Sequence, residues 1–323
     1  MNNVTKDHLR TRQTGLSLVE LMVAIVVGLI LVGGLIQVYL STKQSYNAQE
    51  QLARMQESGR FAMDLITRDL RRAGYWGGNV DTSTFVGGVP GPVNPPTIDC
   101  AGSNDDDWGR SVGWRISGLN NNANNFGCAT GYIPETDIFT VRYAGPETIA
   151  VNPATPDRLY LRSTLFLGRV FKGSEEDNPA NELPPTAEDT PEHLLPTIRP
   201  LISHAYYIGD SGDTCNGVVI PSLNRVRLNE LGRPAVEEIA RGVEQLQVRY
   251  LLNNQYVDAN TVGDNWREVR AVRVWLLTRG ECPEPGLQNN TTYAMGDTSW
   301  AVSDNFRRQL FTSTVMLRNT IVR

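Results

Sequence analysis

The sequence contains few of the residues on which enzymatic and metal chemistry depend. It has three histidines and four cysteines in 323 residues, and no two cysteines are close together. A zinc site usually needs closely spaced cysteines or histidines, and a serine hydrolase needs a nucleophile motif that is also missing. We therefore predict a protein that is not an enzyme and that binds neither a cofactor nor a metal.

The sequence also lacks an excess of positive charge and a second long apolar run. Lys and Arg number 30 against 35 Asp and Glu, a net charge of −5. This balance excludes a protein that binds nucleic acid through overall basic charge. Because 40% of the residues are hydrophobic, a disordered chain is excluded as well. With a single apolar run, the chain is not a multi-span membrane protein.

That apolar run lies near the N-terminus and is long enough to cross a membrane. It extends from Leu16 to Leu40, and its only charged residue is Glu20. The uncharged residues 21–42 would form a helix about 33 Å long at a rise of ~1.5 Å per residue, which matches a bilayer core of about 30 Å. The run therefore predicts one transmembrane helix over residues 16–40.

Positive charge is distributed unevenly on the two sides of this run. Basic residues precede it, and the next one is Lys43. The positive-inside rule then predicts a cytoplasmic N-terminus and a periplasmic remainder, in the inner membrane. A secretory signal peptide is the alternative, but it would have a shorter apolar region and a small-residue cleavage site. A plain membrane anchor has no use for Glu20, whose burial in hydrocarbon costs about 2.5 to 3.5 kcal/mol.

The segment Gly15-Leu16-Ser17-Leu18-Val19-Glu20 closely resembles the cleavage motif of type IV prepilins. The resemblance implies that prepilin peptidase cuts between Gly15 and Leu16, removes a leader of residues 1–15, and leaves Leu16 to be N-methylated. The resemblance also implies that Glu20 pairs with the N-terminal amine of a neighbouring subunit. The family usually has Phe where Leu16 stands.

The helical pattern continues beyond the membrane run. No proline occurs between Gln44 and Ala73, and apolar residues recur on one face. Gly74 is a helix stop signal. We predict a helix over residues 16–73, about 87 Å long, of which residues 41–73 are an amphipathic continuation.

The rest of the chain favours strands. Residues 74–135 are rich in Gly, Pro and Asn and predict a loop-rich excursion, and residues 136–323 predict a β-rich periplasmic head. The expected fold class is α+β: a long N-terminal transmembrane helix packed on a mainly antiparallel β head with loop-rich insertions. The predicted strands are 138–143, 158–166, 201–208, 218–228, 243–252, 269–278 and 310–317.

Three later segments resemble the PilW family of minor pilins: residues 58–75, 269–277 and 307–315. The resemblance implies a type IV pilus subunit that helps to start assembly at or near the tip. Its partners would be prepilin peptidase, other minor pilins, the major pilin and a possible tip adhesin, without direct binding of nucleic acid. The J-type minor pseudopilins of type II secretion are similar in plan. A membrane-anchored periplasmic binding or sensing protein is the alternative from another class.

The four cysteines all follow the membrane run, on the side predicted to be oxidising, and are disulfide candidates. Three pairings are possible from sequence, and we favour neighbours: Cys100 with Cys128, and Cys215 with Cys282. Separate aspartates are weak calcium candidates, namely Asp105, Asp107, Asp210 and Asp213. Neither acidic group has the spacing of a calcium-binding loop, so solvated turns are the preferred interpretation.

Overall fold

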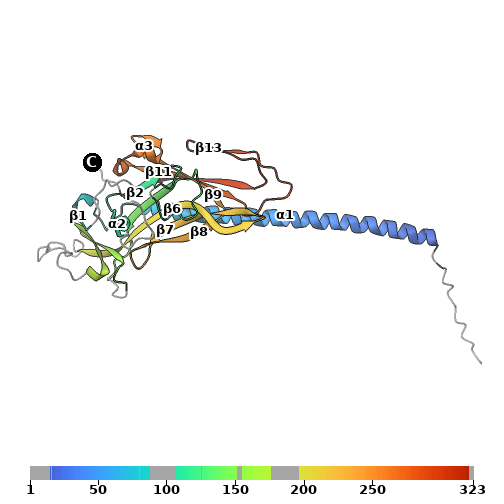
Figure 1. Ribbon diagram of the computed structural model, residues 1–323, viewed down its shortest axis with the longest axis horizontal. Helices are drawn as coiled ribbons and strands as arrows, with labels where there is room; N and C mark the ends of the chain where they lie inside the picture. Colours follow the sequence, from blue (N-terminus) through green and yellow to red (C-terminus); the bar gives the residue numbers. More distant parts are fainter. Residues whose placement is uncertain are drawn as a thin grey trace, which may run out of the picture. The chain divides into compact units, whose positions relative to one another are not determined.

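A computed structural model describes residues 15, 17–79, 81–87, 106–124, 126–150, 155–175 and 196–319. The chain divides into two compact units, and the boundary falls between Glu50 and Gln51. The predicted long helix is present as α1, Leu18–Arg72 (Figure 1). The first unit consists of the α1 residues up to Glu50. Most of the second unit is β-sheet.

In the second unit, one face of α1 is buried against the head. Its buried positions recur every three or four residues, as expected for an amphipathic helix, and they are Met55, Gly59, Ala62, Ile66, Asp69 and Leu70. At Gly59 the helix approaches a strand closely, because a Cβ there would lie 2.2 Å from the ring of Phe311. α1 ends before Gly74, which has a φ of +73° and reverses the chain direction at little cost.

The larger sheet of the head has eight strands in the order β1-β5-β4-β6-β3-β2, with β7 beside β6 and β8 beside β7. All neighbours are antiparallel except β1 and β5. The long strand β6 (Thr197–Cys215) pairs with β4, β3 and β7 along its length. The other strands are β1 (Phe85–Val86), β2 (Ile116–Leu119), β3 (Ile138–Ala144), β4 (Leu159–Ser163), β5 (Gly168–Lys172), β7 (Val218–Leu228) and β8 (Pro234–Arg241).

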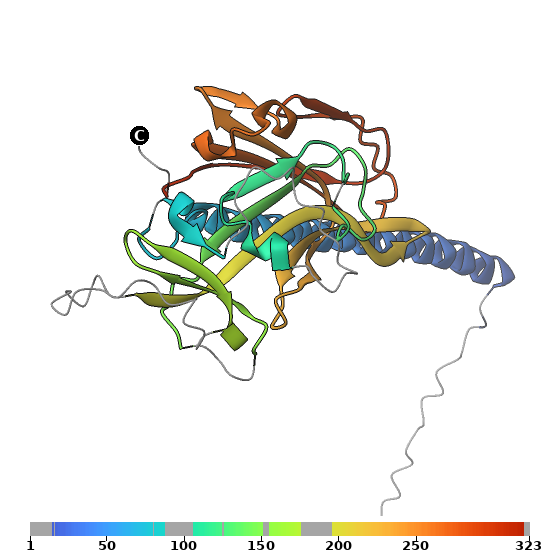
Figure 2. The ribbon, with the colours of Figure 1, turned by 60° about the vertical axis from the view of Figure 1, so that its left-hand side comes forward.

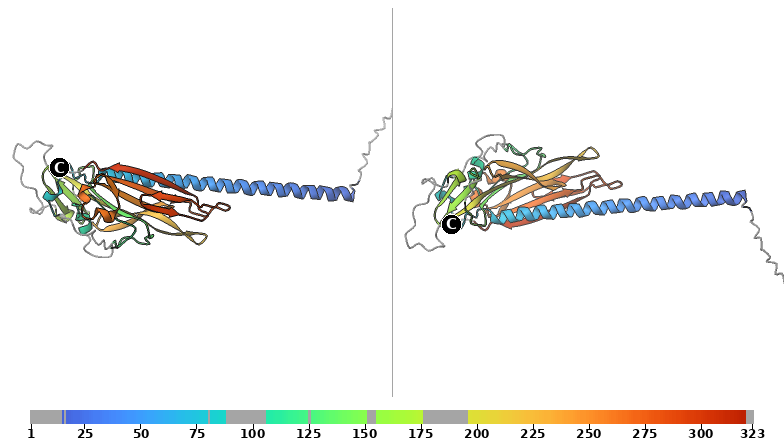
Figure 3. Two further views of the ribbon diagram at one scale, coloured as in Figure 1. Left: turned by 90° about the horizontal axis from the view of Figure 1, so that it is seen from above. Right: turned by 90° about the horizontal axis from the view of Figure 1, so that it is seen from below.

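The second sheet has four antiparallel strands in the order β10-β9-β11-β14, drawn in orange to red in Figure 3. They are β9 (Val243–Leu252), β10 (Gln255–Val257), β11 (Ala271–Arg279) and β14 (Arg308–Met316). A separate hairpin joins β12 (Thr292–Met295) to β13 (Thr298–Ala301). Short helices complete the head: α2 (Asp106–Arg110), α3 (Ala259–Val262), and the 3-10 turns Thr82–Thr84, Gly173–Glu175 and Trp266–Glu268.

In the second unit, α1 lies against the strands of the head (Figure 2). The main hydrophobic core joins this part of α1 to both sheets. Ile66 and Leu70 of α1 belong to the same cluster of buried side chains as Val141 of the larger sheet and Val274 of the smaller one. Burying such apolar surface is the main driving force of folding. The predicted α+β class is therefore confirmed, with a mostly antiparallel head that packs on the end of a long apolar helix.

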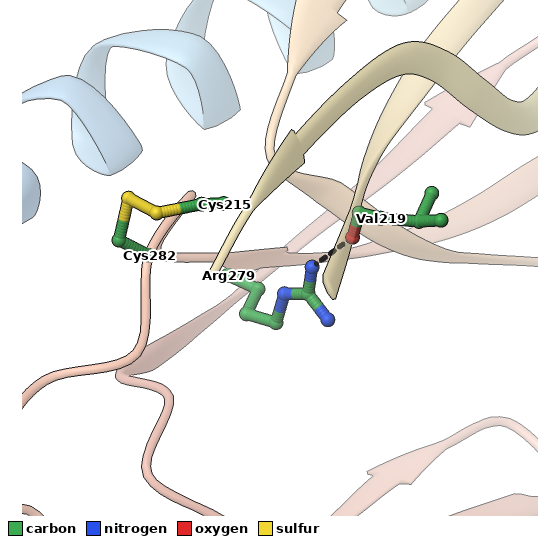
Figure 4. The surroundings of a disulfide bond; sticks show 4 residues. All are labelled: Cys215, Val219, Arg279 and Cys282. Carbon is green, nitrogen blue, oxygen red and sulfur yellow. Dashed lines mark hydrogen bonds between the residues drawn. A yellow bond between two sulfur atoms is a disulfide. The ribbon is translucent and has the colours of Figure 1, made fainter. Parts of the chain in front are cut away.

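A disulfide bond joins the two sheets at one edge. Cys215 ends β6 and Cys282 follows β11, with Cα atoms 5.3 Å apart. Beside it, the Arg279 guanidinium donates a hydrogen bond to the Val219 carbonyl at 2.7 Å (Figure 4). The disulfide closes a long stretch of chain, since 67 residues separate the two cysteines.

We expect the paired replacement of Cys215 and Cys282 by serine to lower the free energy of unfolding by up to about 4 kcal/mol. On the loop-entropy account, a cross-link over this separation restricts the unfolded chain by that amount. The urea midpoint of the full chain in detergent micelles measures the change. An unchanged midpoint would show that the bond does not restrict the unfolded chain.

Candidate assembly site

The N-terminal end of α1 holds the residues of the prepilin motif. Gly15 and Ser17 precede the helix, and Glu20 lies exposed in its first turn. A carboxylate in that position interacts favourably with the helix dipole. Leu16 lies outside the described residues. A Cβ at Gly15 would meet no atom of the described residues within 4 Å.

The first unit of α1 presents apolar side chains on all sides. Leu29 is 67% exposed and Leu35 is 70% exposed, and their neighbours are similar. Among the described residues, α1 is long and apolar enough to cross a membrane. A helix that is apolar all round requires a lipid environment or other apolar helices. The segment is therefore suited to membrane insertion and to lateral packing.

A carboxylate at the other end of α1 anchors the helix to the larger sheet. Asp69 is 5% exposed. Its Oδ1 accepts a hydrogen bond from the Tyr143 hydroxyl at 2.7 Å. Its Oδ2 accepts from the Tyr206 hydroxyl at 2.5 Å and lies 2.5 Å from His204 Nδ1, which must carry the proton to bond a carboxylate. Strands β3 and β6 supply these partners, so one side chain ties the helix to two adjacent strands.

The electrostatics of this cluster favour the charged form of Asp69. Burial alone would raise the pKa of the carboxyl group, but the bonds from His204, Tyr206 and Tyr143 outweigh burial and hold that pKa below its usual value. Burial and the nearby carboxylate raise the pKa of both tyrosines. The two hydroxyls therefore remain protonated and continue to donate.

The sequence interpretation missed the role of Asp69. A detectable signal exists, because Asp69 falls on the same helical stripe as Ala62, Ile66 and Ala73. A charge on an apolar stripe needs a buried partner. His204 lies in the predicted strand 201–208, and the sequence does not show that it faces Asp69.

The structure places the disulfide candidates in two groups. Cys215 and Cys282 are bonded to each other. Cys128 is fully buried and also takes part in a disulfide bond. Cys100, its proposed partner, lies outside the described residues.

Of the four weak calcium candidates, the structure describes the side chains of Asp210 and Asp213, and these two bind different partners. Asp210 accepts a hydrogen bond from the Gly212 amide at 2.7 Å, and Asp213 pairs with Arg241 at 2.5 Å. Asp105 and the side chain of Asp107 lie outside the described residues. In the described ranges, no group of three or more His, Cys, Asp or Glu side chains is placed to hold a metal ion.

No curated protein matches the chain in sequence. Among solved structures, the chain is similar to the type IV-like pilin TTHA1219 from Thermus thermophilus, with 12% identity and a TM-score of 0.38. That match covers 82% of this chain and 96% of the other.

Two family matches concern separate parts of the chain. Residues 10–36 match the prokaryotic N-terminal methylation motif. Residues 205–319 match the family described as type IV pilus-assembly protein W, PilW, and span β7, β9, β11 and β14. With a match to the methylation motif before its apolar helix and a PilW match in its head, the chain is similar to PilW-type minor pilins of the type IV pilus.

Proposed function

We propose that this chain is a precursor that prepilin peptidase cleaves between Gly15 and Leu16, and that the mature subunit helps to start type IV pilus assembly at or near the tip. The observation that supports the proposal best is the methylation motif at residues 10–36, directly before an exposed apolar helix. The PilW match in the head favours a minor subunit over a major one. Its partners would be other minor pilins, the major pilin and a tip adhesin.

In this proposal α1 first spans the inner membrane, with the N-terminus in the cytoplasm and the head in the periplasm. Basic residues precede the span and none lies within it, which favours that orientation. The apolar side chains that face lipid before assembly would face neighbouring pilin helices afterwards. Because lipid tails and helix side chains are similarly apolar, this transfer exposes little apolar surface to water.

Glu20 would determine the axial register of the subunit in the filament. A carboxylate among apolar helices is stable only when a positive charge lies at the same height. Cleavage after Gly15 creates an amine at Leu16, four residues before Glu20. Packing at other heights would leave Glu20 unpaired, and this cost selects the correct neighbour position.

We expect Glu20→Ala to leave membrane insertion and leader removal intact and to reduce incorporation into pili at least tenfold. The loss of one buried ion pair, about 3 kcal/mol or more, is sufficient for this effect. Immunoblots of sheared pili against total membranes measure it. Glu57→Ala, at an exposed position on the same helix, is the matched control.

Two outcomes would contradict the proposal. Normal incorporation of the Glu20→Ala chain would show that the carboxylate does not select register. Normal piliation together with loss of protein secretion, when the whole chain is deleted, would assign the protein to type II secretion instead.

A further inference from the structure

A cleft opens on the outer face of the smaller sheet, away from the residues of the assembly site. It has a volume of about 570 Å³. Its floor is formed by β11, one wall by β10 and the start of α3, and the other wall by the turn between β12 and β13. This size lies in the range of small-ligand sites, which is about 300 to 1,000 Å³.

Arg273 lies on the floor in a fixed orientation. Its guanidinium is stacked 4.2 Å from the ring centre of Tyr256 and 5.9 Å from that of Trp275. Its Nε donates a hydrogen bond to the Thr314 hydroxyl at 3.0 Å. The two terminal nitrogens of the planar guanidinium therefore remain able to bind a carboxylate through two parallel hydrogen bonds.

The protein does not neutralise this cation within the part of the chain that the structure describes. Among the described residues no ion pair involves Arg273, whereas the neighbouring Arg249 pairs with both Asp137 and Asp297. Arg249 is 4% exposed at its side chain and its charge is satisfied internally. Of the two arginines that line the cleft, Arg273 is thus the one that has no ion-pair partner among the residues the structure describes.

The walls of the cleft provide hydrogen-bond acceptors and apolar surface. Asp258 accepts two hydrogen bonds from Thr261, at 2.8 Å and 3.0 Å, and keeps lone pairs that face no other donor in the described residues. The carboxylate of Asp297 is 55% exposed. Ionised carboxylates accept hydrogen bonds from hydroxyl groups. Tyr256 and Trp275 also line the cleft and add aromatic surface that a sugar ring can contact.

We propose that this cleft binds a saccharide that carries a carboxylate, of the hexuronic acid type. The acid group would bind the terminal nitrogens of Arg273, and the ring hydroxyls would donate to Asp258 and Asp297. A simple anion would gain only the first of these interactions, and a neutral sugar would gain only the second. The inference is independent of the role proposed for the chain in the pilus.

Ligand-observed saturation-transfer NMR on the full chain in detergent micelles tests the proposal. The probes are methyl glucuronide, methyl glucoside and sodium acetate, since the two sugars differ only in a carboxylate against a hydroxymethyl group. We expect methyl glucuronide to bind at least tenfold more tightly than methyl glucoside or acetate. Charge-assisted bonds to a fixed guanidinium are strong enough for a difference of this size.

Variants identify the residue responsible. Arg273→Gln should reduce glucuronide binding at least tenfold, and Arg273→Lys should restore part of it, because the charge remains without the planar pair of donors. Arg270→Gln, at an exposed position outside the cleft, is the control and should bind as the wild type does. Equal urea midpoints would show that the variants are folded.

The proposal is overturned by any of three results. These are equal affinity for the acidic and the neutral sugar, unchanged glucuronide binding by Arg273→Gln, and no saturation transfer to any probe at millimolar concentration. Tight binding of acetate alone would show a simple anion site.

Discussion

Replacing Asp69 with alanine is expected to lower the free energy of unfolding of the head by about 3 to 5 kcal/mol. The substitution leaves three buried donors without an acceptor: the hydroxyls of Tyr143 and Tyr206, and Nδ1 of His204. Breaking a buried polar cluster by removing one member is strongly destabilising because the remaining groups stay desolvated. Urea denaturation of the full chain in detergent micelles measures the change.

The pH dependence gives a second measure of the same cluster. The folded protein holds the pKa of Asp69 below its ordinary value of 3.8. The unfolded chain therefore binds this proton more readily, so the contribution of Asp69 is complete above about pH 5 and is lost as the pH falls through the folded-state pKa. We expect the difference in unfolding free energy between wild type and Asp69→Asn to shrink between pH 5 and pH 3.

Asp64→Ala is the matched control for Asp69→Ala. Asp64 lies five residues earlier in α1, and its side chain is 62% exposed beside Arg68. Exposed ion pairs contribute little, so this variant should change stability by no more than about 0.5 kcal/mol. If Asp69→Ala has an equally small effect, the buried cluster does not anchor the helix.

The long helix could be predicted from the local sequence pattern alone, as could its division into an apolar segment and an amphipathic one. An apolar run of 25 residues, followed by an apolar stripe without proline, is consistent with one element over residues 16–73. The structure gives Leu18–Arg72. Strands with strong apolar alternation were also predicted, and β9 has the expected bounds of Val243–Leu252.

Strands on the edge of a sheet were missed. β8 begins with Pro234 and carries Glu237 and Glu238, so its local sequence does not favour a strand. It forms because β7 offers a partner on one side and the charged side chains remain near water. Glu237 pairs with Arg225 and Arg227 of β7 across the strand boundary. Such pairing depends on contacts across the turn between β7 and β8, from 10 to 12 positions apart, which the pattern within one segment does not contain.

The same distinction explains which site residues were found. Glu20 can be singled out from the sequence alone, because a single carboxylate within an apolar run is unusual whatever its partners are. Asp69 and Arg273 look like ordinary charged residues in the sequence. Their roles depend on what the fold brings near them: β3 and β6 around Asp69, and two aromatic rings beside Arg273.

Replacing Gly15 with valine is expected to abolish leader removal and, with it, entry into pili. Peptidase sites bind an extended backbone, and a β-branched side chain next to the cleaved bond restricts and crowds that conformation. The uncleaved chain also has no amine at Leu16, so the Glu20 of a neighbouring subunit would lack its proposed partner. Intact-mass measurement of membrane protein should show all 15 leader residues retained.

Two further variants make this result specific to the cleavage site. Gly28→Ala changes a glycine within the span, where a Cβ meets no atom within 4 Å, and should leave processing and incorporation unchanged. Leu16→Phe installs the residue that prepilins usually have after the cut and should be processed at least as well as the wild type. Normal processing of Gly15→Val would show that Gly15 does not define the cleavage site. A native wild-type protein that still begins at Met1 would show that α1 enters the membrane as an ordinary anchor, because the amine proposed to pair with Glu20 would never form.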